Sequence, residues 1–187
     1  MRKMETIKEV CKKKLNLGCG TDIRKGYVNL DFDEREGVDV VWDIDKFPWP
    51  FKEKEFDFVY TSHLLEHVND IVKTMSEIKR ICKNGAIITI RVPHFSCGVS
   101  YRDPTHKRFL SYHTFDYFTE DCFYKHLPTF EIVDRRLNFT RMSFTSLNYL
   151  FNPIINANPT IYERFFCWIL PCYEALFKLK VVRKYEN

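Results

Sequence analysis

Two glycines and a carboxylate near the start of the chain have the residue types and spacing to hold a small polar ligand. Gly18 and Gly20 interrupt an apolar run that begins at Leu15, and Asp31 ends a second short run eleven residues after Gly20. Glycines let the backbone approach a ligand, and a carboxylate at a strand end can accept from the two hydroxyls of a ribose. A Gly-x-Gly pair is also common in ordinary turns, so the residues that follow must decide.

Polar residues also end the next two apolar runs. Asp43 and Ile44 come after the third run, and Thr61 and Ser62 end the fourth. In an open α/β sheet the carboxyl ends of parallel strands lie along one edge, where ligands bind. These residues are therefore expected to meet at one edge of a sheet.

The elements that would position them are short strands bounded by polar or glycine punctuation. Apolar residues recur at helical spacing in Leu64–Cys82, which predicts a helix, and Lys83–Gly85 is expected to close it. Strand, helix, strand in this order indicates a parallel βαβ unit and therefore the doubly wound α/β class. The predicted strands are Lys14–Leu17, Tyr27–Leu30, Val38–Trp42, Phe56–Tyr60, Ala86–Val92 and Phe130–Phe139.

Taken in order, these motifs resemble those of the class I S-adenosylmethionine-dependent methyltransferases. The stretches that carry the resemblance are LNLGCG, GYVNLD, VDVVWDI, FPWPF and FDFVYTSHLLEH, within residues 14 to about 95. The resemblance implies a Rossmann-like, mainly parallel, seven-stranded sheet with an aromatic-rich insertion or lid. It also implies S-adenosylmethionine as cofactor and one domain, with a basic segment (1–13), a cofactor-binding half (14–95) and a substrate-side half with the lid (96–187).

The resemblance also implies a role for each motif residue. Gly18, Cys19 and Gly20 would pass under the methionine part of the cofactor, and Asp31 would accept from the ribose. The remaining expected contacts are Asn16 near the cofactor's amino group, Phe32 over the adenine face, Asp43 and Ile44 at the adenine nitrogens, and Thr61 and Ser62 beside the ammonium and sulfonium.

The chain departs from the expected pattern at two places. Most relatives carry Asp or Glu where this chain has Asn16, which weakens one contact to the cofactor's amino group. The spacing from Gly20 to Asp31 is also shorter than the roughly 20 residues of a dinucleotide-binding fold, so that Thr21–Gly26 can make only a short turn. This spacing argues against NAD.

His63, Glu66 and His67 match the letters H-x-x-E-H of inverted zinc proteases. A zinc site needs a third ligand from elsewhere, and the same letters arise at this position of the methyltransferase pattern. We therefore expect no metal here. Glu66 and His67 are interpreted as polar residues at the start of the helix that line the cofactor cleft.

Candidate catalytic residues follow the fifth predicted strand. A hydroxyl acceptor must lose a proton as it is methylated, and histidine is the usual base. His94 and His106 are the candidate bases, and Asp103 is the candidate orienting residue. A histidine in a loop is also often a structural hydrogen-bonding residue.

The expected acceptor is a small molecule, glycan or lipid, and a hydroxyl is the expected acceptor group. The net charge of +4 comes from the N-terminal segment rather than from a basic stripe, which argues against nucleic acid. The fourth strand ends in Thr61-Ser62-His63 and not in the Asn/Asp-Pro-Pro-aromatic motif of enzymes that methylate nucleic-acid or glutamine nitrogens. The alternatives are a methyltransferase acting on nucleic acid or protein, and a non-catalytic cofactor-binding domain. The sequence leaves the acceptor and the oligomeric state open.

The cysteines and the C-terminal aromatic segment bear on location. Seven cysteines form no C-x-x-C pair, and no apolar signal-peptide core begins the chain, so we expect reduced thiols and a cytoplasmic protein. Cys97 and Cys122 are interpreted as packing residues. Thr160–Leu179 carries an aromatic face with basic flanks, which we predict to be core and lid, with peripheral contact to a membrane as the alternative.

Overall fold

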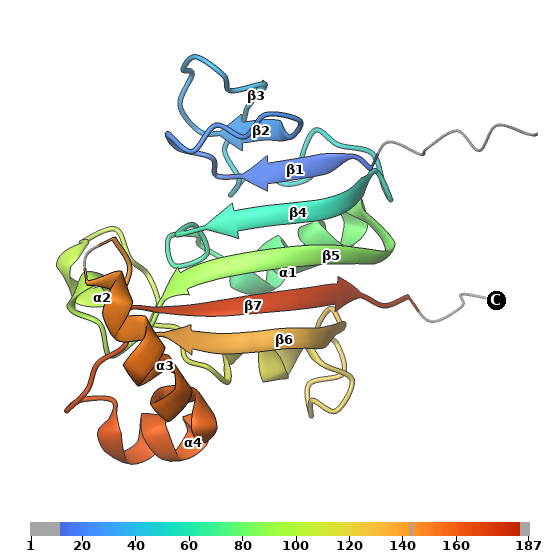
Figure 1. Ribbon diagram of the computed structural model, residues 1–187. Helices are drawn as coiled ribbons and strands as arrows, with labels where there is room; N and C mark the ends of the chain where they lie inside the picture. Colours follow the sequence, from blue (N-terminus) through green and yellow to red (C-terminus); the bar gives the residue numbers. More distant parts are fainter. Residues whose placement is uncertain (1–11, 143, 184–187) are drawn as a thin grey trace, which may run out of the picture.

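The computed structural model describes residues 12–142 and 144–183, which form one seven-stranded sheet with flanking helices (Figure 1). The strands are β1 (Lys14–Leu17), β2 (Val28–Asp31), β3 (Val40–Val41), β4 (Phe56–Ser62), β5 (Cys82–Pro93), β6 (Phe130–Asn138) and β7 (Glu174–Val181). Their order is β3-β2-β1-β4-β5-β7-β6. The pairs among β1 to β5 are parallel, and β7 is antiparallel to both β5 and β6. The predicted Rossmann-like, mainly parallel sheet is confirmed.

The predicted strands lie close to their predicted positions. β1 has the predicted bounds, whereas β3 is much shorter than predicted. β5 is longer, because Cys82 already pairs with Phe56 and the register resumes after a shift at Phe58 and Ile87. Gly85 lies inside this strand with a φ of +79°. The prediction that Gly85 closes a helix is therefore wrong.

The helix α1 (Ile71–Ile81) packs against β5. Asp70 caps it, because its carboxylate accepts a hydrogen bond of 3.0 Å from the backbone N–H of Lys73. The residues before the cap form turns, and His63 among them has a φ of +55°. The predicted start at Leu64 is therefore wrong, since the apolar spacing continues through a turn that only Asp70 ends.

Within the described residues no helix joins β1 to β2, β2 to β3 or β3 to β4. Two buried asparagines hold the turn 21–26 against the sheet instead. The side-chain amide of Asn16 donates to the carbonyl of Asp22 at 2.7 Å and to Oδ1 of Asn29 at 3.0 Å. The backbone N–H of Arg24 donates to the same Oδ1 at 2.9 Å. The predicted short turn after Gly20 is confirmed.

Three helices of the second half of the chain, α2 (Gly98–Arg102), α3 (Asn148–Ala157) and α4 (Pro159–Ile161), lie near the carboxyl edge of the parallel strands, where the arrowheads of β4 and β5 point (Figure 1). In the same view, α1 lies behind the sheet and α3 in front of it. The other helical segments of this half are the 3₁₀ helices η1 (Thr114–Phe118) and η2 (Thr145–Leu147) and the π-helical turn η3 (Tyr162–Phe166).

The aromatic segment after α4 is only partly core. Cys167 and Phe177 are buried, but Phe165, Trp168 and Ile169 are 61%, 65% and 80% exposed. These exposed side chains are therefore not core, and their expected part in a lid stays a prediction.

The N-terminal segment, the cysteines and the helix lengths bear on the remaining predictions. The basic segment 1–13 lies outside the described residues except for Lys12 and Lys13. The six cysteines in the described ranges are free thiols. No helix in the described ranges combines the length and the apolar character that crossing a bilayer requires.

Candidate active site

A cavity of about 220 Å³ lies where β1, β2 and β3 end, and we call it the strand-end cavity. Its walls come from the turn after β1, the end of β2, the residues after β3 and the turn after β4. Five residues predicted at the cofactor line it, namely Gly18, Asp31, Phe32, Asp43 and Ile44.

The glycines after β1 have left-handed backbone conformations, with φ of +67° at Gly18 and +53° at Gly20. A Cβ atom on Gly18 would lie 2.6 Å from a side-chain carbon of Leu64, which is too close. A Cβ atom on Gly20 would meet no atom within 4 Å. Gly18 is therefore required by packing as well as by its conformation, whereas Gly20 borders open space.

The Asp31 carboxylate is fixed by backbone donors. Its Oδ2 accepts from the N–H of Gly20 at 2.7 Å, and its Oδ1 accepts from the N–H of Asp33 at 3.2 Å. An ionised carboxylate has about four acceptor positions, so Asp31 can still accept from a ligand. The adjacent Phe32 is 68% exposed and leaves its ring available at the same wall.

The loop after β3 is also held in place. Asp43 accepts from the backbone N–H of Asp45 at 3.0 Å and lies 3.7 Å from the ammonium of Lys46. The carbonyl of Ile44 accepts from the indole N–H of buried Trp49 at 2.9 Å. These bonds fix Asp43 and Ile44 at the cavity wall.

A second cavity, of about 440 Å³, shares His67 with the strand-end cavity and therefore lies beside it. We call it the histidine cavity. Three imidazoles and two carboxylates line it, together with Arg102, Val99 and Pro104; the imidazoles and carboxylates belong to His63, His67, His106, Glu66 and Asp103. The predicted residues His106 and Asp103 are thus brought together.

Residues 12–90, which include β1 to β4, α1 and most of β5, match the family model for a methyltransferase domain. A SAM dependent methyltransferase from Archaeoglobus fulgidus has the same fold over 91% of this chain and 86% of its own, with a TM-score of 0.63 and 20% identity. A putative methyltransferase from Bacillus halodurans C-125 matches over 92% and 93%, with a TM-score of 0.59 and 17% identity. Residues 12–90 therefore resemble a methyltransferase domain, and the fold is that of the class I methyltransferases. No sequence among curated proteins matches this chain.

The fold shared with these methyltransferases does not by itself fix the reaction. The [4+2]-cyclase SpnF has the same fold over 92% of this chain and 75% of its own, with a TM-score of 0.59 and 15% identity. Function must therefore be argued from the residues of the site.

Four other residues predicted at the cofactor do not line the strand-end cavity. Asn16 is buried, and both of its amide bonds described above hold the turn after β1. Cys19 is 4% exposed, and burial raises the pKa of its thiol. Thr61 is buried, and its hydroxyl has no hydrogen-bond partner among residues 12–142 and 144–183, while Ser62 is half-buried at the end of β4. Their expected roles at the cofactor stay predictions.

His106 has one ring nitrogen fixed and one available. Its Nδ1 lies 2.9 Å from the carbonyl of Ser100, which can only accept, so Nδ1 carries the proton and Nε2 the lone pair. Nε2 lies 3.9 Å from a carboxylate oxygen of Asp103. Asp103 itself accepts from both the hydroxyl and the N–H of Thr105, which lower the pKa of its carboxyl.

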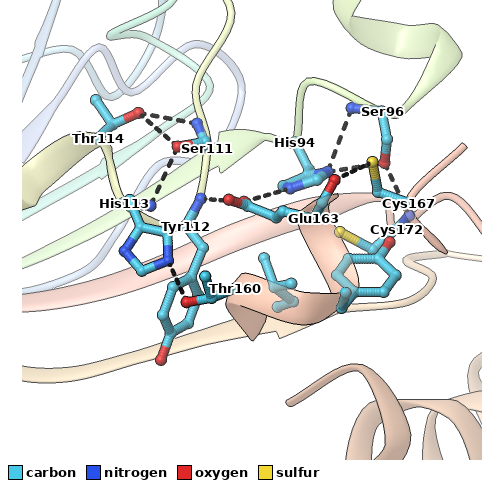
Figure 2. Close-up of polar contacts among 12 residues, drawn as sticks. His94, Ser96, Ser111, Tyr112, His113, Thr114, Thr160, Glu163, Cys167 and Cys172 are labelled. Carbon is cyan, nitrogen blue, oxygen red and sulfur yellow. Dashed lines mark hydrogen bonds and ion pairs between the residues drawn. The ribbon is translucent and has the colours of Figure 1, made fainter. Parts of the chain in front are cut away.

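His94 has neither nitrogen available (Figure 2). It is fully buried, with Nδ1 2.8 Å from the hydroxyl of Ser96 and Nε2 2.9 Å from Glu163. Glu163 also accepts from the N–H of Tyr112 at 2.6 Å. His94 therefore ties the end of β5 to η3, and we favour His106 as the group that meets an acceptor.

Sequence patterns missed the charge cluster behind His63. Glu174 begins β7, fully buried, and accepts from Arg91 at 2.6 Å and from Asn138 at 2.9 Å, while Nε2 of His63 lies 3.7 Å away. Burial alone would raise the pKa of Glu174, but its contacts with His63, Arg91 and Asn138 outweigh burial and lower it to about 2. The side chain of Arg141 contacts His63 as well. The residues of this cluster are far apart in the sequence, so only a prediction of how β5, β6 and β7 pair could have revealed it.

Two larger cavities, of about 940 and 690 Å³, share His113 and Tyr117 and lie around η1. Neither contains a residue of the strand-end or the histidine cavity. We therefore do not assign the cofactor or the acceptor to them.

Proposed function

We propose that the protein transfers a methyl group from S-adenosylmethionine to a hydroxyl of a small-molecule, glycan or lipid acceptor. The observation that carries this proposal is that His67 lines both the strand-end cavity and the histidine cavity. One cavity offers a carboxylate and a glycine turn suited to a nucleoside, and the other offers basic nitrogens suited to a hydroxyl. A transfer between two bound groups requires this adjacency.

The strand-end cavity fits the cofactor. Asp31 keeps acceptor positions for two ribose hydroxyls, Gly20 leaves open space beside the backbone, and the exposed ring of Phe32 can cover the adenine. When bound, S-adenosylmethionine supplies an electrophilic methyl group on a sulfonium.

The histidine cavity supports an acceptor that must lose a proton. The lone pair of His106 at Nε2 is oriented by the bond from Nδ1 to Ser100, as a general base requires. Arg102 lines the same cavity and supplies a positive charge that suits an acceptor carrying an anionic group.

Exposed apolar residues near the carboxyl edge support a lipid among the acceptor classes. Phe165, Trp168 and Ile169 are exposed beside the exposed Arg164, whose guanidinium lies over the ring of Phe165. Aromatic side chains next to a basic residue suit the headgroup region of a bilayer. We include contact between residues 161–169 and a lipid surface in the proposal.

Titration calorimetry with S-adenosylhomocysteine tests the cofactor assignment. We expect Asp31→Ala to lose about 1–3 kcal/mol of binding free energy, because a charged hydrogen-bond acceptor is removed. Asp33→Ala is the matched control, since this neighbouring carboxylate is exposed and does not line the cavity. Equal affinities of wild type and Asp31→Ala would remove Asp31 from the site, and no binding by the wild type would overturn the proposed function.

A further inference from the structure

Glu66, His67 and His106 converge in the histidine cavity. One ligand-type atom from each lies within 4.8 Å of the other two. Two residues come from the turn before α1, and the third comes from the loop after α2. We propose that these three side chains bind a divalent transition-metal ion.

The state of Glu66 is the first independent observation. Its side chain is fully buried, and neither carboxylate oxygen has a hydrogen-bond partner in the described part of the chain. The nearest basic groups are Nδ1 of His63 at 3.4 Å and Nε2 of His106 at 4.0 Å. Burying a carboxylate is costly unless hydrogen bonds, an ion pair or a metal compensate it. His63 offers Oε1 only a long ion-pair contact, and neither oxygen accepts a hydrogen bond among the described residues, so the carboxylate points to a cation.

The hydrogen bonds of the two histidines are the second observation. Nδ1 of His67 lies 2.9 Å from the hydroxyl of Thr105, and this hydroxyl donates its own proton to Asp103 at 2.7 Å. The hydroxyl must therefore accept from Nδ1 of His67, which leaves the lone pair on Nε2. Nδ1 of His106 donates to the carbonyl of Ser100, with the same result. A metal-binding histidine characteristically donates its other N–H in this way, which fixes the ring and its tautomer.

The fold supplies the ligand that the sequence motif lacks. In H-x-x-E-H, the two histidines are His63 and His67, and the absence of a third ligand is why the sequence predicts no metal. His63 instead contacts Arg141 and lies 3.7 Å from Glu174, on the side toward β7. His106 takes its place, with its ring centroid 4.6 Å from that of His67.

Two imidazoles and one carboxylate select the class of metal. Zinc, iron(II) and manganese accept this set, whereas magnesium and calcium prefer oxygen ligands alone. With zinc–ligand bonds of about 2.0–2.1 Å, tetrahedral ligand atoms lie roughly 3.3 Å apart, so small side-chain rotations would close the site. The remaining coordination positions would take oxygen atoms of water or of the acceptor. In that arrangement His106 would be a ligand, and the metal would lower the pKa of a bound hydroxyl so that its proton passes to water; without the metal, the imidazole would accept that proton.

Metal content tests the site without an activity assay. Protein without a histidine tag is stripped with a chelator, equilibrated with zinc by dialysis and analysed for bound metal; cobalt(II) replaces zinc for visible absorption spectra. We expect one equivalent in the wild type and at least tenfold weaker binding in Glu66→Gln and His106→Gln, which keep similar side-chain volumes. His126→Ala is the control, because this exposed histidine lies outside the histidine cavity. This variant should still bind one equivalent of zinc.

The experiment tests the metal site separately from the proposed function. Only the role of the metal in binding the acceptor rests on the proposed function. Absence of stoichiometric zinc in the wild type, or unchanged binding in folded Glu66→Gln, would overturn the metal site. Circular dichroism reports folding, and S-adenosylhomocysteine titration of the same samples reports the cofactor site. Zinc binding without S-adenosylhomocysteine binding would support the metal site while contradicting methyl transfer.

Discussion

At the scale of single residues, the histidines divide into two kinds by what their ring nitrogens contact. Both nitrogens of His94 are bound to neighbouring side chains inside the fold. His67 and His106 each have one ring nitrogen in a hydrogen bond, and both residues line the histidine cavity. The second kind can act on a ligand, whereas the first kind stabilises the structure.

His106→Ala is expected to lower turnover by about 10²–10⁴-fold, the usual contribution of a general base, while the affinity for S-adenosylhomocysteine stays unchanged. The measurement is transfer of a labelled methyl group to a panel of hydroxylated sugars, phenols and lipids. His126→Ala should keep wild-type turnover. Wild-type turnover of His106→Ala from pH 6 to 9 would leave this imidazole no role in activating the acceptor.

The sequence could place some site residues but not others, for physical reasons. Asp31 and Asp43 were found because a carboxylate at a strand end is a local signal. The burial of Glu66 could not be predicted, since it depends on His106 and the loop that covers it. His94 was assigned to the ligand edge correctly by position, but its partner Glu163 is 69 residues away and invisible to any local pattern.

At the scale of elements, Glu174 connects the three strands of the C-terminal side. It lies on β7 and accepts from Arg91 on β5 and Asn138 on β6. The two pairings of β7 bring these residues together, because Glu174 is opposite Pro93 in one ladder and opposite Asn138 in the other. The cluster holds the strand ends beside His63.

Glu174→Gln should lower the free energy of unfolding at pH 7 by about 3–5 kcal/mol, since it removes the fully buried carboxylate that the half-buried Arg91 and His63 contact. The folded-state pKa of Glu174 is about 2, below its ordinary 4.5. Its stabilisation is therefore complete above pH 4.5 and is lost as the pH falls toward 2. Urea unfolding of wild type and variant from pH 2 to 7 measures both effects.

Glu131→Gln is the control for this measurement. Glu131 on β6 forms an ion pair with Lys180 on β7, but the side chain of Glu131 is 53% exposed. An exposed pair contributes about 0–1 kcal/mol, so this variant should unfold nearly like the wild type. Equal losses in the two variants would contradict the special role of the buried carboxylate.

Strands were predicted well because alternation and β-branched residues are local signals, and β1 was placed to the residue. The start of α1 was missed, because the apolar spacing continues from Leu64 through a turn and only the cap at Asp70 marks the boundary. The end of α1 was missed because β5 begins at Cys82, directly after the last helical residue, so that Gly85 lies within the strand.

At the scale of the whole molecule, the exposed apolar side chains of residues 165–169 are the surface that we propose to contact lipid. Trp168 is 65% exposed, so its fluorescence reports contact with lipid. We expect a blue shift of the emission with vesicles that contain anionic lipid, and Phe165→Ser with Ile169→Ser should remove binding in a sedimentation assay. An unchanged spectrum and no sedimentation of the wild type would contradict contact with a lipid surface.

His67 belongs to the walls of both cavities, and this has a thermodynamic consequence. A ligand that fixes the orientation of this ring in one cavity changes the free energy of binding in the other. Linkage requires the effect to be reciprocal, so the factor by which the first ligand alters the affinity for the second equals the factor in the opposite direction. Binding in the two cavities is thus coupled through one imidazole. The total free energy of binding both ligands does not depend on which ligand binds first.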